Sequence, residues 1–74
     1  MKNMAYIRNY YKVPAKRGAR IEWSGDEMAK FIRGFLYIPK KGTIVAARGG
    51  YLRVRFDNEQ HIVTLHPTWK VKYL

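Results

Sequence analysis

Basic and aromatic side chains alternate through one segment in the second half of the chain. Tyr51, Arg53 and Arg55 recur every second residue, the spacing that places side chains on one face of a β-strand, and Arg48 precedes them across a glycine pair. Guanidinium groups bind phosphate oxygens, and a tyrosine ring stacks on bases. We therefore predict a nucleic-acid-binding face. An ordinary solvated face is the alternative, although like charges on one face repel one another and a bound polyanion offsets that repulsion.

A second group of basic residues accompanies two predicted turns. Lys16, Arg17 and Arg20 belong to the first turn, and Lys40 and Lys41 belong to the second. If both turns lie at one end of the fold, these side chains enlarge the basic surface; otherwise they act only as solubilising residues. The full set of predicted nucleic-acid-binding residues is Arg48, Tyr51, Arg53, Arg55, Lys16, Arg17, Arg20, Lys40 and Lys41.

The other titratable residues give no basis for catalysis or metal binding. His61 and His66 are the only histidines, the chain has no cysteine, and no acid stands at the spacing of a zinc site. We interpret His66 as a turn residue whose ring bonds to the backbone. The sequence contains no recognisable triad and no glycine-rich phosphate loop, and so small a core leaves little room for a concave site. We predict a non-enzymatic protein without metal or cofactor.

Composition limits the class of partner. Fifteen Lys and Arg against five Asp and Glu give a net charge of +10, and such a field attracts polyanions. Seventy-four residues suffice for one domain, and 47% hydrophobic residues are too many for a disordered chain of this charge. The longest apolar run has four residues, far short of the roughly 20 that cross a bilayer. We expect a cytoplasmic protein that does not enter membranes.

The chain divides into an N-terminal segment and one folded domain. Residues 1–14 mix tyrosines with basic residues and end at a proline, which predicts a basic, aromatic arm or edge strand, and residues 15–74 form the domain. Alternation over residues 19–23 predicts a strand. Ser24 and Glu27 match a capping box, and an apolar stripe from Met28 to Phe35 predicts one short helix at about residues 25–34. An irregular loop is the alternative, because so short a helix depends on tertiary contacts.

Turn residues separate the later apolar runs into antiparallel hairpins. A two-residue turn at Gly49-Gly50 places Val45 opposite Val54, and a two-residue turn at residues 58–59 places Val63 opposite Val54 and His61 opposite Phe56. Both turns put the same side chains inside, which supports this register. A three-residue bulged turn at Gly49 would instead turn Ile44 and Ala46 inward, and this alternative stays open.

A closing strand follows a tight turn at residues 66–68. Trp69, Val71 and Tyr73 alternate with two lysines, and we expect Trp69 and Trp23 to be core aromatics. About five short antiparallel strands avoid exposed edges by curling into a small barrel. The fold class predicted from the residues is therefore mainly β, a small antiparallel barrel with one short helix.

Part of the chain resembles a known motif. Lys41-Gly42-Thr43-Ile44-Val45, followed by a turn and Leu52-Arg53-Val54-Arg55-Phe56, resembles the KOW motif of SH3-like barrels in ribosomal and transcription-elongation proteins. The resemblance covers about a third of the chain and implies an SH3-like barrel that contacts RNA or polymerase. Gly42 corresponds to the motif glycine.

A larger part of the chain is similar to short, uncharacterised bacteriophage-encoded basic proteins. This similarity is carried by Tyr11, Val13-Pro14-Ala15-Lys16-Arg17-Gly18, Tyr51-Leu52-Arg53-Val54-Arg55, His66-Pro67-Thr68-Trp69 and Tyr73-Leu74. It implies a phage or prophage origin and carries no known activity.

The sequence thus predicts a sequence-nonspecific nucleic-acid-binding protein that acts through phosphate contacts. The sequence does not distinguish DNA from RNA or single from double strands as the ligand. It is also compatible with either a monomer or a weak homo-oligomer. The first alternative is a protein-interaction module, such as a phage inhibitor or adaptor that binds an acidic patch on a host protein. The second alternative is a minor virion or assembly protein. An exposed cluster of Ile44, Tyr51 and Ile62 without flanking arginines would favour a protein partner.

Overall fold

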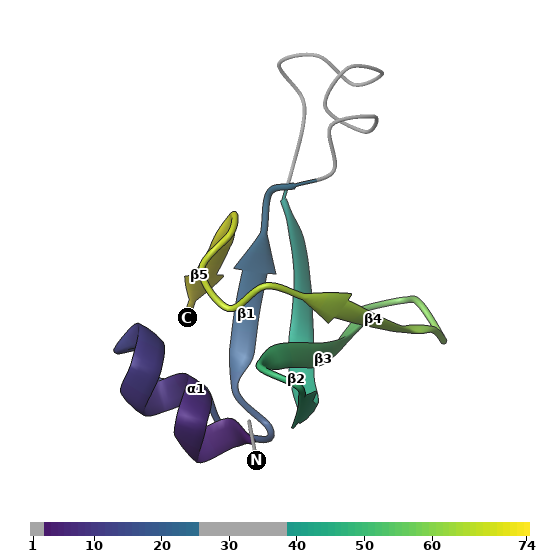
Figure 1. Cartoon of the computed structure of the whole chain (residues 1–74). Helices are drawn as coiled ribbons and strands as arrows, with labels where there is room; N and C mark the ends of the chain where they lie inside the picture. Colours follow the sequence, from purple (N-terminus) through teal and green to yellow (C-terminus); the bar gives the residue numbers. More distant parts are fainter. Residues whose placement is uncertain (1–2, 26–38) are drawn as a thin grey trace.

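In the computed structural model, which describes residues 3–25 and 39–74, one antiparallel sheet forms the domain and one short helix lies beside it (Figure 1). The five strands have the order β4-β3-β2-β1-β5. The elements are α1 (Met4–Tyr11), β1 (Arg20–Trp23), β2 (Lys40–Arg48), β3 (Tyr51–Phe56), β4 (Ile62–Leu65) and β5 (Val71–Tyr73). The predicted fold class, mainly β with five antiparallel strands and one short helix, is confirmed. The helix predicted at about residues 25–34 falls, apart from residue 25, outside the described residues.

The N-terminal segment is a helix, so the prediction of an arm or edge strand was wrong. Asn3 caps α1, because its side-chain oxygen accepts the backbone N–H of Tyr6 at 3.1 Å. Lys12 ends the helix in a left-handed conformation. Ile7 is fully buried in the core, and Met4 and Tyr11 pack against it from the same helix face. Burial of this apolar face holds so short a helix in place.

The hairpin of β2 and β3 turns at Gly49-Gly50, as predicted, and then departs from the predicted register. Both glycines have positive φ, and Ala47 lies opposite Leu52. A bulge between Ile44 and Ala46 then places Ile44, and not Val45, opposite Val54. The prediction that Val45 faces inward was wrong, because the extra residue turns the remainder of β2 by one position. Ile44 is fully buried, while Ala46 stays opposite Arg53.

The pairing of β3 with β4 is the predicted one. Leu52 lies opposite Leu65, and Val54 lies opposite Val63. The turn itself begins one residue earlier than predicted, since the N–H of Glu59 donates to the carbonyl of Phe56 at 3.2 Å and Asn58 adopts a positive φ. The pairing ends at Ile62, so His61 is not paired with Phe56.

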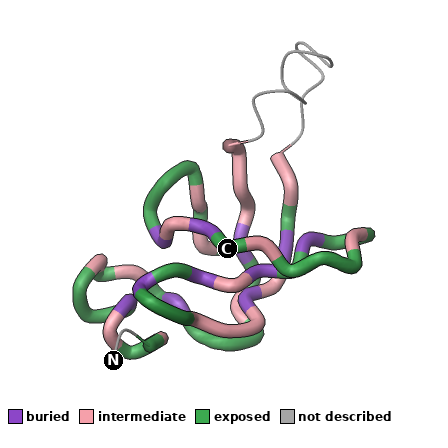
Figure 2. Tube along the Cα trace, turned by 45° about the vertical axis from the view of Figure 1, so that its right-hand side comes forward, coloured by how far each residue is buried: buried purple, intermediate pink, exposed green. Residues whose placement is uncertain are grey.

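Strand alternation divides the sheet into two faces. We call the buried side the inner face and the opposite side the outer face. The core contains Ile7, Ala15, Ile21, Ile44, Leu52, Val54, Phe56 and Leu65, most of them from the inner face. Figure 2 shows buried positions interspersed with half-buried and exposed ones along the trace. The outer face of β3 therefore consists of Tyr51, Arg53 and Arg55.

The two tryptophans lie at one edge of the core. Trp23 is half-buried and stacks on Phe56, with ring centroids 5.5 Å apart. Trp69 belongs to the connection before β5 and is 51% exposed, so its prediction as a core strand residue was wrong. Gly25 packs so closely on both indoles that a Cβ there would lie within 2.6 Å of each ring.

Candidate nucleic-acid interface

The arginines of β3 stand on the outer face among small or uncharged neighbours. Arg53 lies between Ala46 of β2 and Thr64 of β4, and Arg55 lies between Thr43 and Ile62. None of these cross-strand neighbours is an acid. Within the described part of the chain, neither arginine forms an ion pair. Both guanidinium groups are thus available to an external anion.

A cavity of about 250 Å³ lies beside Arg53 on this face. Its walls are formed by Val45, Ala46, Ala47, Arg48, Arg53 and Ile62. The Nε of Arg53 is buried and has no hydrogen-bond partner among the described residues. A buried donor without an acceptor costs free energy unless a ligand or water satisfies it. Phosphate and carboxylate oxygens are the acceptors that form the strongest hydrogen bonds with a guanidinium group. Arg48, which lines the same cavity, adds a second positive charge.

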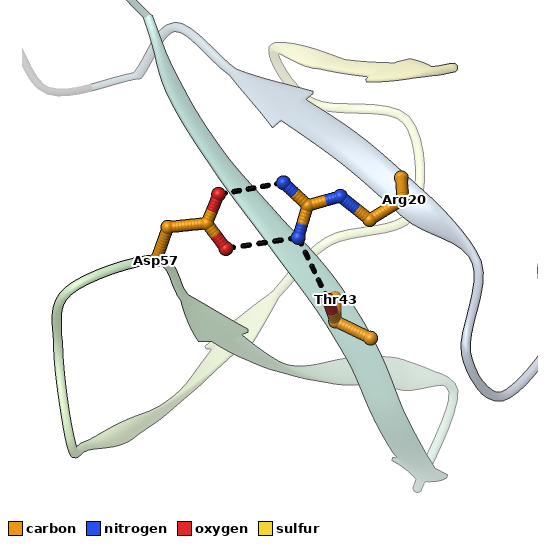
Figure 3. A network of polar contacts seen from close by, with 3 residues as sticks. All are labelled: Arg20, Thr43 and Asp57. Carbon is orange, nitrogen blue, oxygen red and sulfur yellow. Dashed lines mark hydrogen bonds and ion pairs between the residues drawn. The ribbon is translucent and has the colours of Figure 1, made fainter.

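Arg20 is engaged with an acid, although its side chain is 43% exposed. Its Nη2 lies 2.6 Å from Oδ2 of Asp57, and its Nη1 donates to Oδ1 of Asp57 and to Oγ1 of Thr43, both at 2.8 Å (Figure 3). These contacts join β1, β2 and the loop after β3. The hydrogen bonds from Arg20 hold the pKa of the Asp57 carboxyl below its usual value, and the charges of Arg20 and Lys41 lower that pKa further. Asp57 therefore stays charged, and Arg20 serves first as a clamp between strands.

The second predicted basic group does not assemble. Lys16 and Arg17 are exposed in the turn before β1, and this turn is bonded to the bulge region of β2 through the Gly18 amide and the Ile44 carbonyl, at 2.8 Å. Lys40 lies at the opposite end of β1, across from Trp23. Antiparallel pairing separates the two turns, because residues at the start of β1 face the middle of β2 and residues at its end face the start of β2.

Lys40 and Lys41 point to different faces of the sheet. Lys40 lies over the Phe56 ring at 5.3 Å, and its Nζ is 3.0 Å from a carboxylate oxygen of Glu59. It is therefore no part of the outer face, contrary to the predicted clustering. Lys41 lies opposite Glu22 on the outer face, and its carbonyl accepts the N–H of Asp57 at 2.9 Å. The outer face thus keeps Lys41 at its margin.

A row of aromatic rings continues the outer face toward α1. We call the rings of Tyr6, Tyr10, Tyr11, His66 and Tyr51 the aromatic strip. Successive ring centroids in this order lie 5.3, 4.9, 5.2 and 6.1 Å apart. The sequence identified only Tyr51 of these rings as a binding residue. The spacing of four residues between Tyr6 and Tyr10 was the signal that these two side chains would share one face of a helix.

His66 holds the junction of the aromatic strip. Its Nδ1 accepts the backbone N–H of Thr68 at 3.1 Å, so the interpretation of His66 as a turn residue bonded to the backbone is confirmed. Its ring meets Tyr11 and Tyr51 edge-to-face. Burial raises the pKa of the Tyr11 hydroxyl, and the neighbouring hydroxyls of Tyr6, Tyr10 and Tyr51 raise it further. The hydroxyls of Tyr6, Tyr10 and Tyr51 therefore lie near enough to that of Tyr11 to disfavour its ionised form.

Comparisons with known proteins leave the resemblances untested. Neither a family model nor a curated protein nor a solved structure matches this chain. The KOW-like and bacteriophage-like similarities therefore stay predictions. Over residues 3–25 and 39–74, no three side chains of His, Cys, Asp or Glu gather into a possible metal site, and no helix is long and apolar enough to span a membrane.

Proposed function

We propose that this protein is a non-enzymatic nucleic-acid-binding protein that holds its ligand through phosphate contacts on the outer face of the sheet. One observation carries the proposal. In the part of the chain that the structure describes, the buried Nε of Arg53 has no hydrogen-bond partner, and it lies beside a cavity that Arg53 shares with Arg48. Arg20 and Lys40, by contrast, form ion pairs with Asp57 and Glu59 within the fold. The outer-face arginines instead present their charge outward, where phosphate oxygens can neutralise it.

The surroundings of the exposed apolar residues favour a polyanion over an apolar protein surface. Ile44 is buried and does not contribute to any surface patch. Ile62 is 47% exposed but lies opposite Arg55 in the sheet. Tyr51 is equally exposed and lies opposite Arg48. Both exposed apolar side chains of the outer face, Tyr51 and Ile62, thus have an arginine opposite them, which suits a ligand that carries both phosphates and bases. Binding to an acidic patch on a protein rests on the same charges and is the alternative outcome of the test.

The salt dependence of binding tests the proposal. If about five basic side chains each neutralise one phosphate, the logarithm of the association constant on duplex DNA falls against the logarithm of the salt concentration with a slope near −4 to −5. The expected contributors are Arg48, Arg53, Arg55, Lys16 and Arg17. Fluorescence anisotropy of a labelled duplex at several salt concentrations measures this slope. A slope near zero, or no binding at low salt, contradicts the proposal and directs the search to acidic proteins.

Removing one acid of the outer face, Asp57, should strengthen binding. In Asp57→Asn, one negative charge is lost and the Arg20 guanidinium is released from its bidentate partner. We expect affinity for nucleic acid to rise about threefold to tenfold and the salt slope to become steeper by about one, the change for one added phosphate contact. Anisotropy titrations at two salt concentrations provide both numbers.

Glu59→Gln is the matched control for that substitution. It removes the same charge from the same loop, but its partner Lys40 lies on the other face. A smaller gain is expected, because only the net charge changes. Equal gains in both variants would show that Arg20 contacts no phosphate when it is released.

A further inference from the structure

We propose that the aromatic strip stacks on unpaired bases, so that the protein prefers single-stranded to double-stranded nucleic acid. This inference rests on the proposed nucleic-acid binding and specifies the class of ligand. Aromatic side chains beside a basic groove are the features that hold single strands without sequence preference. In a duplex the bases are stacked on each other, and their faces are not accessible to protein rings.

The rings have the exposure that stacking on a ligand needs. Tyr10 is 65% exposed and Tyr51 is 47% exposed. These two rings lie on either side of Tyr11 and His66 in the strip. Fully packed aromatics would have no free face. Tyr6 and Tyr10 already stack in near-parallel planes, with 9° between them, which keeps the helix tyrosines in a fixed orientation. Little side-chain entropy is then lost when a base binds.

The strip is continuous with the phosphate-binding cavity. Tyr51 lies directly opposite Arg48, whose side chain lines the cavity, and Arg53 follows two residues later on the same face of β3. A strand whose bases lie on the rings can therefore extend its backbone along these arginines. Positive charge also lies on the helix side, where Arg8 is exposed although its guanidinium donates to the Ala15 carbonyl at 2.8 Å. Bases and phosphates thus meet complementary groups side by side.

His66 and Tyr11 are the packed central rings of the strip. Both are half-buried, and they connect α1 to the outer-face end of the sheet. The N–H of Thr68 fixes the orientation of the His66 ring. The exposed rings are therefore mounted on packed ones, and this arrangement preserves their spacing in the free protein.

The test compares three ligands of equal length: a 12-nucleotide oligothymidine, the same backbone with abasic sites, and a 12-base-pair duplex. Wild type is expected to bind the oligothymidine at least about tenfold more tightly than the abasic strand, as two stacked bases would give. In Tyr10→Ala/Tyr51→Ala this difference between the oligothymidine and the abasic strand should disappear. The wild-type comparison alone decides the point if that variant is poorly folded.

Two further variants separate stacking from other effects of the substitutions. Tyr10→Phe/Tyr51→Phe keeps both rings and should retain the preference for unpaired bases. Trp69→Ala removes an exposed ring of similar accessibility outside the strip and should leave the preference intact. Equal affinity of wild type for all three ligands overturns the inference and leaves phosphate binding in place. Absence of salt-sensitive binding to any of them overturns the proposed function itself.

Discussion

Substitution of Gly42 by alanine is expected to destabilise the domain by about 2–3 kcal/mol, the cost of overpacking a filled site. A Cβ at this position would lie 2.8 Å from the Arg55 carbonyl oxygen, 2.9 Å from Cγ1 of Val54 and 3.0 Å from Cδ1 of Phe56. The first contact is with backbone, so no side-chain rotation relieves it. Since a domain of this length has a total stability of only about 4–11 kcal/mol, the loss is a large share. Urea unfolding followed by circular dichroism measures it.

Gly49→Asn is the matched control for the Gly42 substitution. No atom lies within 4 Å of the position of a Cβ at Gly49, and its φ of +61° is one that asparagine tolerates. An Asn-Gly pair also suits the two-residue hairpin turn. We expect a change in the free energy of unfolding of less than about 0.5 kcal/mol. Comparable destabilisation by both substitutions would show that the close approach at Gly42 is not what requires glycine there.

Loss of both β3 arginines is expected to have the largest effect on binding. In Arg53→Ala/Arg55→Ala, two charge-assisted hydrogen bonds to phosphates are lost, each worth about 1.5–3 kcal/mol. Affinity for nucleic acid should fall by at least about 100-fold, and the salt slope should decrease in magnitude by about two. The fold should persist, because both side chains lie on the outer face. Anisotropy titrations measure the loss, and circular dichroism checks the fold.

A double variant on the other side of the sheet controls for the change in net charge. Lys40→Gln/Lys70→Asn also removes two positive charges, here from side chains that lie over the rings of Phe56 and Trp69. Asparagine suits the positive φ of Lys70. This variant should weaken binding by only about a few fold, because it lowers the overall positive charge of the protein without removing a direct phosphate contact. If both double variants weaken binding equally, the phosphates have no localised site on the outer face.

The candidate site was only partly predictable from the sequence. Alternation along β3 correctly placed Tyr51, Arg53 and Arg55 on one face, because side-chain direction in a strand follows a period of two. The engagement of Arg20 was not predictable, since Asp57 is 37 residues away in sequence. The separation of Lys40 from Lys16 was likewise hidden, because it depends on how β1 pairs with β2.

The aromatic strip depends still more on tertiary structure. Its rings come from α1, from the start of β3 and from the residue after β4. No local period relates these three segments. The packing of Ile7, Met4 and Tyr11 against the core brings the helix to the sheet and places Tyr11 beside His66.

The net charge is a property of composition alone. Three further features could be predicted because they depend on residues close together in the chain: the glycine turn at Gly49-Gly50, the alternation of β3 and its pairing with β4. These follow from backbone conformational preferences and from the two-residue period of a strand. The helix at Met4–Tyr11 and the bulge at Val45 could not be predicted in this way. Both depend on long-range burial, of Ile7 in one case and Ile44 in the other, because the free energy gained in a shared core outweighs local preferences.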